Sequence, residues 1–220
     1  MARNGWAPQR PEVRLPSALP AYDGGALERD GDYDGLEFAG LDLAGQDGGG
    51  ARFLDCRLVR CGLDGVRLPA ARVLDSVLDG VRGVGAELGG ALLRDVEVHE
   101  ARLGGVQLHG AVLERVLFRG GKIDYANFRA ARLRDVVFEG CVLSDVDFGA
   151  AELTRVAFVD CALVRADLTA ARLLDVDLRG AAPLEVSAGL DRLSGATVTP
   201  LQLIDLAPAL AEHLGLRVEP

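Results

Sequence analysis

An apolar residue recurs at every fifth position over more than half of the chain. From Phe38 to Leu178 these positions hold Leu, Phe, Val or Ile in one unbroken register, with Gly48 and Gly83 as the two exceptions. All 7 phenylalanines of the chain fall in this register. A second column of smaller apolar residues precedes the first by two positions, for example at Val96. Such a regularity restricts the chain to a repeating architecture.

The five-residue period excludes a helix and favours short strands. Five residues advance a helical wheel by about 500°, so an apolar column would spiral around a helix. In a strand, residues two apart point the same way and the residue between them points outward. The other two residues of each five are often Gly or Asp, as at Gly80, Asp95 and Gly120, which suits tight corners. We therefore expect an all-β solenoid with the apolar columns inside.

A longer period gives the number of sides in each turn of this coil. Corner positions 20 residues apart read Asp55, Asp75, Asp95, Arg115, Asp135, Arg155 and Asp175. With four sides per turn these residues stack about 4.8 Å apart. The signs alternate from Asp95 onward, as in a ladder of ion pairs, but not before it. Phenylalanines 118, 138 and 158 stack at the same spacing, with 128 and 148 on the opposite wall. A four-sided coil of about eight turns fits both patterns.

These repeats resemble those of a known family. Segments such as ARLRDVVFEG (residues 131–140) and ARLLDVDLRG (residues 171–180) are similar to pentapeptide repeats. The resemblance is strong over residues 36–182 and looser as far as Val198. It implies a right-handed quadrilateral parallel β-helix, and it implies little about function, because most members of the family have none assigned.

The repeat divides the chain into three parts. Residues 1–34 form an N-terminal extended or capping segment, which lies either along the side of the coil or over its first turn. Residues 35–198 form the solenoid, and residues 199–220 form a C-terminal helical cap and tail. Thr199 is a suitable N-cap, followed by Pro200 and by Gln202, which completes a capping box. We expect Pro208 to split this segment into two short capping helices.

The C-terminal segment carries apolar residues on more than one face. One face can cover the last turn of the coil, and the other needs a partner. We expect a homodimer through these helices, with candidate contacts at Leu203, Leu206, Leu210 and Leu214. Members of the similar family also dimerise through C-terminal helices. The alternative is a monomer in which the tail Leu216-Arg217-Val218 covers the spare face.

The residues give no sign of a catalytic, cofactor or metal site. The 4 cysteines, at positions 56, 61, 141 and 161, lie in the inward column of small residues, which predicts buried packing thiols. His99 and His109 lie on opposite walls and cannot share a metal ion. No serine pairs with a histidine in the repeat register, and no GxxxxGK[ST] phosphate loop occurs. We expect a protein that is not an enzyme and needs no cofactor.

Composition limits the location and the partners. The net charge is −9, and residues 36–182 carry 22 acidic and 18 basic side chains of interspersed sign. A direct nucleic-acid-binding protein normally shows a basic patch instead. The apolar runs are far shorter than the roughly 20 residues of a membrane helix. The polar N-terminus lacks the apolar stretch of a signal peptide. We expect a cytoplasmic protein that contacts neither membrane nor nucleic acid.

Two faces are candidates for binding a protein partner. Val77, Leu117, Val137 and Val159 form an apolar face at outward positions. Asp47, Glu87, Asp147 and Asp167 form an acidic face, in one column with Arg67.

The resemblance implies a specific partner for the acidic face. Members of the family that confer quinolone resistance imitate B-DNA and bind type II topoisomerases such as DNA gyrase. A duplex as long as about eight turns of the coil, roughly 39 Å, carries about 23 charges, far more than this mixed surface supplies. The most specific hypothesis is a DNA mimic that modulates or protects gyrase. The alternative is a protein-interaction scaffold with an unknown partner.

Overall fold

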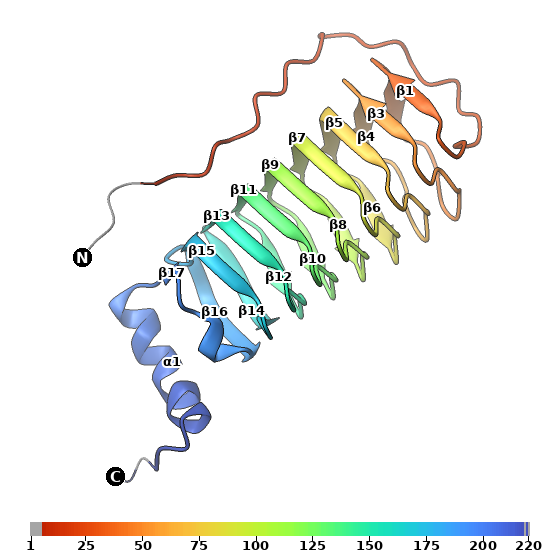
Figure 1. Ribbon diagram of the computed structural model, residues 1–220. Coiled ribbons are helices and arrows are strands. Elements are labelled where there is room, and N and C mark those ends of the chain that lie inside the picture. Colours follow the sequence, from red (N-terminus) through yellow and green to blue (C-terminus); the bar gives the residue numbers. More distant parts are fainter. Residues whose placement is uncertain (1–5, 218, 220) are drawn as a thin grey trace.

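The structure, a computed structural model, describes residues 6–217 and residue 219. It is a parallel β-solenoid of about eight turns, with an extended N-terminal segment on its outside and a helix at its C-terminal end (Figure 1). Strand residues pair with residues 20 positions away, as Leu133 does with Leu113 and Leu153. Because each turn contains four units of five residues, the predicted four-sided coil is confirmed.

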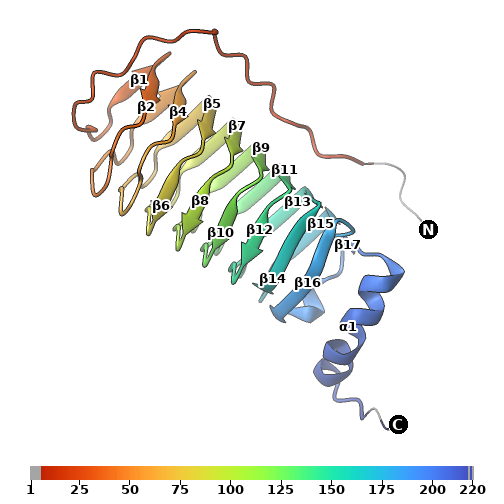
Figure 2. The same ribbon diagram turned by 180° about the vertical axis from the view of Figure 1, so that it is seen from behind.

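The strands form two parallel sheets. The larger sheet has 11 strands: β1 (Asp32–Asp34), β3 (Arg52–Leu54), β5 (Arg72–Asp79), β7 (Leu92–His99), β9 (Val112–Arg119), β11 (Arg132–Glu139), β13 (Glu152–Val159), β15 (Arg172–Asp177) and β17 (Ala196–Thr197) in that order, with β2 (Glu37–Ala39) and β4 (Arg57–Val59) alongside. The smaller sheet has 6 strands, seen from behind in Figure 2: β16 (Ala181–Ala188), β14 (Cys161–Asp167), β12 (Val142–Ser144), β10 (Lys122–Asp124), β8 (Arg102–Gly104) and β6 (Arg82–Val84).

We name the four walls of the coil by the residues of one turn. Wall 1 holds residues 132–134, wall 2 residues 137–139, wall 3 residues 142–144 and wall 4 residue 147, with equivalent residues 20 positions away in other turns. Strand β11 bends around a corner and so contributes to walls 1 and 2. Wall 3 belongs to the smaller sheet, and single bridges between turns hold wall 4 together.

The apolar columns fill the lumen of the coil. Phe118, Phe138 and Phe158 stack with ring centroids 4.9 and 5.0 Å apart. Phe128 and Phe148 stack at 5.1 Å on the opposite side of the lumen. Both predicted stacks are therefore confirmed, and with them the assignment of the five-residue register to the interior.

Each corner of the coil contains a residue in the left-handed conformation. φ is positive at every fifth residue from Asp30 to Asp175. Glycine adopts this conformation freely, whereas other residues, such as Tyr125 with φ of 54°, do so at a cost of about 1 kcal/mol. The corner N–H groups donate to the next turn, as Tyr125 N–H does to Ser144 O at 2.8 Å. These bonds between turns offset the strain and hold the coil square.

The N-terminal end of the lumen is closed by aromatic residues. Tyr22 stacks on Phe38 with centroids 4.4 Å apart, and Tyr33 stacks on Phe53 at 4.9 Å. Leu27 is buried and lies beside Gly48, where an added Cβ would approach it to 3.4 Å. The side chain that is missing from the repeat at position 48 is thus replaced by one from the segment before the coil.

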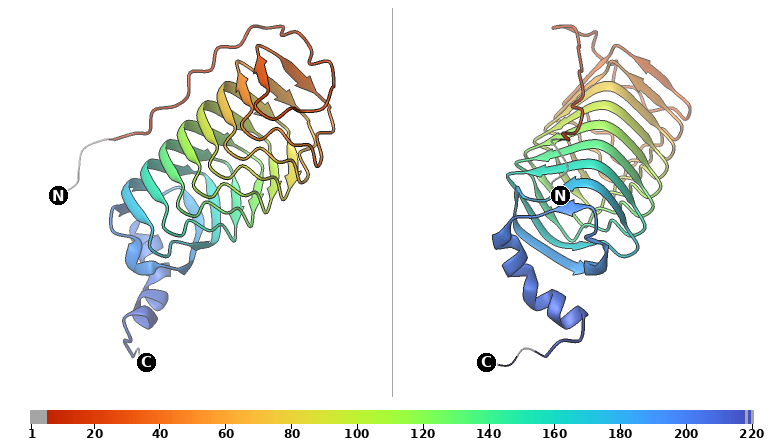
Figure 3. Two further views of the ribbon diagram at one scale, coloured as in Figure 1. Left: turned by 45° about the vertical axis from the view of Figure 1, so that its right-hand side comes forward. Right: turned by 60° about the vertical axis from the view of Figure 1, so that its left-hand side comes forward.

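Residues 6–20, which we call the strap, run lengthwise along the outside of wall 2 (Figures 1 and 3). They contain no helix or strand and bend at residues 17–18, and none of them except the last forms part of a regular hydrogen-bonded pairing with the coil. At the end of the strap, Tyr22 N–H donates to Glu37 O and Glu37 N–H donates to Pro20 O, both at 2.8 Å. These two bonds join the strap to the first turn.

A single helix, α1 (Pro200–His213), follows a 3-10 turn, η1 (Leu190–Arg192), at the C-terminal end. The predicted capping box is present, because Thr199 accepts from Gln202 N–H and Gln202 Oε1 accepts from Thr199 N–H. The predicted split at Pro208 is wrong. Proline removes only one helical donor, and the residues on both sides keep their helical hydrogen bonds. None of the helices in the described part of the chain is long and apolar enough to cross a membrane.

Candidate functional site

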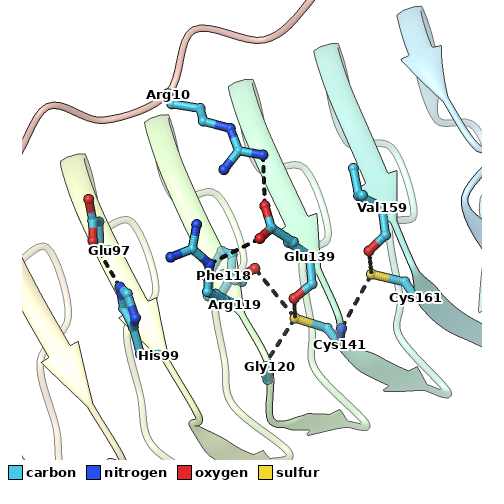
Figure 4. Close-up of polar contacts among 10 residues, drawn as sticks. All are labelled: Arg10, Glu97, His99, Phe118, Arg119, Gly120, Glu139, Cys141, Val159 and Cys161. Carbon is cyan, nitrogen blue, oxygen red and sulfur yellow. Dashed lines mark hydrogen bonds and ion pairs between the residues drawn. The ribbon is translucent and has the colours of Figure 1, made fainter.

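The cysteines lie inside the coil and are free, as the repeat register predicts. Burial raises the pKa of the Cys56 and Cys61 thiols. The Cys141 Sγ donates to Gly120 O at 3.2 Å, and Cys141 N–H points to the Cys161 Sγ at 3.4 Å (Figure 4). Among the described residues, no group of three or more His, Cys, Asp or Glu is arranged to hold a metal ion. All four thiols are buried and pack inside the lumen.

Ion pairs between neighbouring turns are the commonest feature of the outer surface. Eight arginines pair with a carboxylate 20 residues away: Arg52 with Asp32, Arg57 with Glu37, Arg67 with Asp47, Arg115 with Asp95, Arg119 with Glu139, Arg155 with Asp135, Arg165 with Asp145 and Arg172 with Glu152. Each exposed pair contributes little, about 0–1 kcal/mol. Together they leave much of the surface with locally balanced charge.

The predicted corner ladder forms in pairs rather than continuously. Arg115 Nε donates to Asp95 Oδ1 at 2.6 Å, and Arg155 Nε donates to Asp135 Oδ1 at 2.7 Å. Asp75 has no such cation. Burial raises its pKa, and the carboxylates of Asp95 and Asp55 raise it further. The lack of alternation that the sequence shows before Asp95 thus leaves Asp75 between two like charges.

The acidic candidates do form one column, on wall 4. Bridges join Asp47 to Arg67, Arg67 to Glu87, and Asp147 to Asp167. Three of the four carboxylates serve the fold as well: Asp47, Asp147 and Asp167 each accept from the backbone N–H two residues ahead, at 3.0, 2.7 and 2.7 Å.

The charge of this column is also interrupted and partly neutralised. Arg29 and Arg67 pair with Asp47, and Arg129 pairs with Asp147. Between Glu87 and Asp147 the column holds two amides, and Asn127 Nδ2 donates to Gln107 Oε1 at 2.8 Å. The column is therefore not a continuous strip of negative charge.

The apolar candidates lie in wall 2, but most of them are not exposed. Leu117 and Val137, which we expected at the surface, are buried, with 3% and 2% exposure. Val77 is half-buried, and only Val159 is exposed, at 37%. The reason is the strap, which lies over this wall and which the repeat pattern could not place. We call the outward apolar residues Val77, Leu117, Val137 and Ala157 the Val137 column, which Glu97 interrupts between Val77 and Leu117.

The strap is fastened to wall 2 at both ends of this column. Gln9 N–H donates to Asp135 Oδ1 at 3.1 Å. Arg10 Nη2 donates to Glu139 Oε2 at 2.7 Å, the bond drawn in Figure 4. Nearer the first turn, Pro16 O accepts from Arg57 Nη2 at 3.1 Å.

These contacts lower the pKa of both carboxylates that hold the strap, Asp135 and Glu139. The Arg10 hydrogen bond lowers the pKa of Glu139, and Arg119 adds to this effect, against a smaller opposing effect of burial. Burial raises the pKa of Asp135, but hydrogen bonds from Arg155 and from Gln9 N–H outweigh it and the pKa lies below its usual value. Both groups are therefore held as carboxylates.

The C-terminal candidates divide between the inside and the outside of α1. Leu206 is buried against the last turn, so its expected role as a dimer contact is wrong. Leu210 is half-buried, while Leu203 and Leu214 are exposed at 53% and 69%. Of the predicted covering tail, Leu216 is itself 60% exposed and Val218 lies outside the described residues.

A basic column on wall 3 escaped the sequence analysis. Strands β6, β8 and β10 place Arg82, Arg102 and Lys122 next to one another. Lys122 pairs with Asp124 at 2.8 Å, and the described residues provide no carboxylate within ion-pair distance of the two arginines. The three residues lie beside a shallow hollow that Asp79 and Glu100 also line. Their 20-residue spacing is visible in the sequence and could have revealed the column.

Comparison with known families and structures identifies the repeats. Residues 51–128 match the model of a pentapeptide repeat region, and residues 122–158 match that of pentapeptide repeats in 8 copies. Comparison with curated protein sequences gave no significant match.

Several solved structures are similar to this chain at low identity. HetL, a pentapeptide repeat protein involved in heterocyst differentiation regulation in the cyanobacterium Nostoc sp. strain PCC 7120, is 23% identical, with coverage of 79% of this chain and 92% of HetL and a TM-score of 0.36. A trypsin-treated variant of QnrB1, a plasmid-mediated fluoroquinolone resistance protein, is 17% identical, with coverage of 92% and 100% and a TM-score of 0.41. Full-length QnrB1 is 16% identical, with coverage of 90% and 95% and a TM-score of 0.28.

Proposed function

Because the chain belongs to the pentapeptide-repeat family, we propose that it is a non-enzymatic, rigid protein-binding module that pairs with a second copy through helix α1. The observation that carries the pairing is the exposed apolar surface of α1. Leu203, Ile204 and Leu214 are exposed at 53%, 66% and 69%. Contiguous exposed apolar surface of this kind marks a protein contact.

The exposed residues share one face of the helix. With 3.6 residues per turn, Leu203, Ala207, Leu210 and Leu214 fall on one stripe, with Ile204 at its edge. The side that carries Gln202 and Leu206 is buried against the coil. A stripe on one helix can pack against the same stripe of a second copy around a twofold axis, which closes the assembly at two chains.

The pairing is tested by the mass of the full chain in solution. We expect a dimer at micromolar concentration in analytical ultracentrifugation, and Leu203→Glu to weaken it about 100-fold, because a charge would enter the apolar stripe. Asp205→Asn is the matched control, since Asp205 is an exposed residue of the same helix on another face. A wild-type monomer at tens of micromolar, or a dimer unaffected by Leu203→Glu, would exclude this contact.

The surface charge favours a general protein partner over a DNA-mimic function at a type II topoisomerase. Duplex DNA carries one negative charge per about 1.7 Å of its axis. The acidic column on wall 4 is broken by Arg67 and by the amides of Gln107 and Asn127. Ion pairs between turns balance much of the remaining surface.

A supercoiling assay with DNA gyrase, with and without a fluoroquinolone, separates the two hypotheses. For a scaffold with another partner we expect no effect of this protein at tens of micromolar. Inhibition, or protection from drug-induced cleavage, at low micromolar protein would instead support the DNA mimic. In that case Asp147→Asn and Asp167→Asn would be the first substitutions to test, because these two carboxylates are neighbours in the column.

A further inference from the structure

The strap covers an outward column of wall 2 that is apolar apart from Glu97, which lies between Val77 and Leu117 and pairs with His99. In wall 2 the side chains of Val136 and Phe138 point into the lumen, so that of Val137 points outward. Val137 and Leu117 are nevertheless only 2% and 3% exposed, and Ala157 is 8% exposed. Their cover must come from outside the coil, and the segment that lies there is the strap (Figure 1).

The strap has the alternation expected of an extended chain lying on a surface. Pro11 is buried and Val13 and Leu15 are half-buried, whereas Glu12 and Arg14 between them are exposed. From Arg10, which pairs with Glu139, to Pro16, which accepts from Arg57, six extended residues span about 20 Å. The four turns between these partners span about 19 Å at the inter-strand spacing. The length of the strap therefore matches the column that it covers.

The attachment of the strap depends on side chains rather than on a sheet edge. Wall 2 presents its outer face, so its backbone groups are already paired between turns. The wall instead offers carboxylate oxygens of Asp135 and Glu139 and a guanidinium of Arg57. A proline-rich segment suits such a surface, because it lacks several N–H donors and loses little conformational entropy on binding.

We propose that the Val137 column is a docking groove for an extended, proline-punctuated protein segment, and that the strap occupies it as an intramolecular competitor. The partner segment carries apolar residues at alternate positions and an arginine that reaches Glu139. The anchor is weak enough to be displaced: Arg10 is 49% exposed, and such exposed pairs contribute about 0–1 kcal/mol. The bonds at Pro20 and Tyr22 keep the strap attached when its outer part leaves.

This inference rests on the proposed protein-binding function but uses residues other than those of α1. A tethered segment competes at a millimolar effective concentration, so the intact strap should block a peptide of the same sequence. The test therefore weakens the strap in the full-length chain and supplies the segment separately. The probe is a fluorescein-labelled peptide of residues 6–20, WAPQRPEVRLPSALP, titrated in an anisotropy assay.

The key variant is the double substitution Gln9→Pro and Arg10→Glu, which removes both anchors at Asp135 and Glu139. We expect it to bind the peptide at least about tenfold more tightly than the wild-type chain does. Arg14→Glu is the matched control, because the Arg14 side chain is 85% exposed and pairs with its neighbour Glu12 in the strap rather than with the coil. The control should behave as wild type. A peptide in which Arg10 is replaced by glutamate should lose the binding.

The fluorescence of Trp6, the 1 tryptophan of the chain, reports separately whether the strap has moved. If the double variant shifts the emission of Trp6 but binds no peptide, the column is not a docking groove. If it neither shifts the emission nor binds peptide, the strap is not displaceable. Either result overturns the proposal. Sedimentation of the same samples shows whether pairing through α1 persists, so failure of this inference is distinguishable from failure of the proposed dimer.

Discussion

The two ends of the solenoid cover the apolar lumen in different ways. At the N-terminal end, Tyr22 and Tyr33 stack on the first inward phenylalanines, and Tyr33 and Leu27 are 7% and 6% exposed. At the C-terminal end, the last inward residues are only half-buried, among them Leu184 and Leu193. Helix α1 touches that end mainly through one buried face and leaves its other face exposed.

This contrast teaches that a repeat coil does not need symmetric caps. The N-terminal end cannot stack on another coil, because aromatic residues of the same chain already cover its apolar surface. An end covered by a helix with a spare apolar stripe can join one partner. In the pairing proposed above, the closed N-terminal end would limit the assembly to two chains and prevent a fibre. The following predictions test how different the ends are.

The largest effect should come from opening the sealed end. Phe38→Ala removes a ring with 0% exposure that contacts Tyr22, Tyr33 and Phe53. We expect a loss of about 3–5 kcal/mol in the free energy of unfolding, measured by urea denaturation, because a cavity replaces the ring. Hydrogen exchange should accelerate in the first two turns and not near residue 138, since each turn contacts only its neighbours. A loss below about 1 kcal/mol would mean that the aromatic cap is dispensable.

A smaller effect is expected from the equivalent substitution at the other end. Leu206→Ala removes the main buried apolar side chain of α1, which is 5% exposed. We expect a loss of about 2 kcal/mol, at the lower limit for leucine to alanine, because the surrounding end is already partly hydrated. Equal losses for this variant and for Phe38→Ala, under the same urea conditions, would remove the distinction between the ends.

The hydrogen bonds that attach α1 to the coil should contribute less to stability than the burial of Leu206 does. Gln202 Nε2 donates to Leu178 O and to Ala181 O, each at 2.7 Å. Gln202→Ala should destabilise the chain by about 1–2 kcal/mol, because two carbonyl oxygens lose their donor and the capping box is lost. Thermal unfolding monitored by circular dichroism at the helical signal measures this. Thr199→Ser, which keeps the hydroxyl, is the control and should have little effect.

The smallest effect concerns the strap and depends on pH. The pKa values of Asp135 and Glu139 are lowered in the folded chain, so their contribution is complete above the ordinary pKa of about 4 and is lost as the pH falls through the lower folded values. The arginines that face them, Arg10, Arg119, Arg134 and Arg155, stay charged throughout. We expect the Trp6 emission to shift below about pH 4 while the coil remains folded.

The Arg10→Glu variant supplies the reference for this pH experiment. Its Trp6 emission should already be shifted at pH 7, because two carboxylates would then face each other. Arg14→Glu should follow the wild-type titration. A wild-type emission that does not change between pH 6 and the onset of unfolding would show that these two carboxylates do not hold the strap.

The sequence predicts the coil well because the determinants of the coil are local. Two residues in five point into the lumen and one forms the corner, so the phenylalanine stacks, the buried cysteines and the column of Asp147 and Asp167 all follow from counting. The same counting gave wrong exposures for Leu117 and Val137, since it treats every outward position as solvent-facing.

The path of the strap depends on a match between the strap and the Val137 column, which are far apart in the sequence and are not related by the repeat. A clue existed: Pro11, Val13 and Leu15 alternate with polar residues, and an outward apolar column without a partner lies elsewhere in the chain. Neither pattern alone says that the two meet. The split at Pro208 was predicted wrongly for a related reason: the sequence shows the local preference of proline, but not that the helix continues on both sides of it.

The alternating corner charges have a consequence for how such a chain finds its fold. Turns that are near copies of one another can stack in the wrong order, and looping out one turn would keep every apolar residue in the lumen. Loss of the turn that holds Arg115 would set Asp95 against Asp135, and loss of the turn that holds Asp135 would set Arg115 against Arg155, in place of the observed pairs. The alternating charges thus help to select the correct order of turns. Correct neighbours attract each other, whereas skipping a turn brings like charges together and is disfavoured by repulsion.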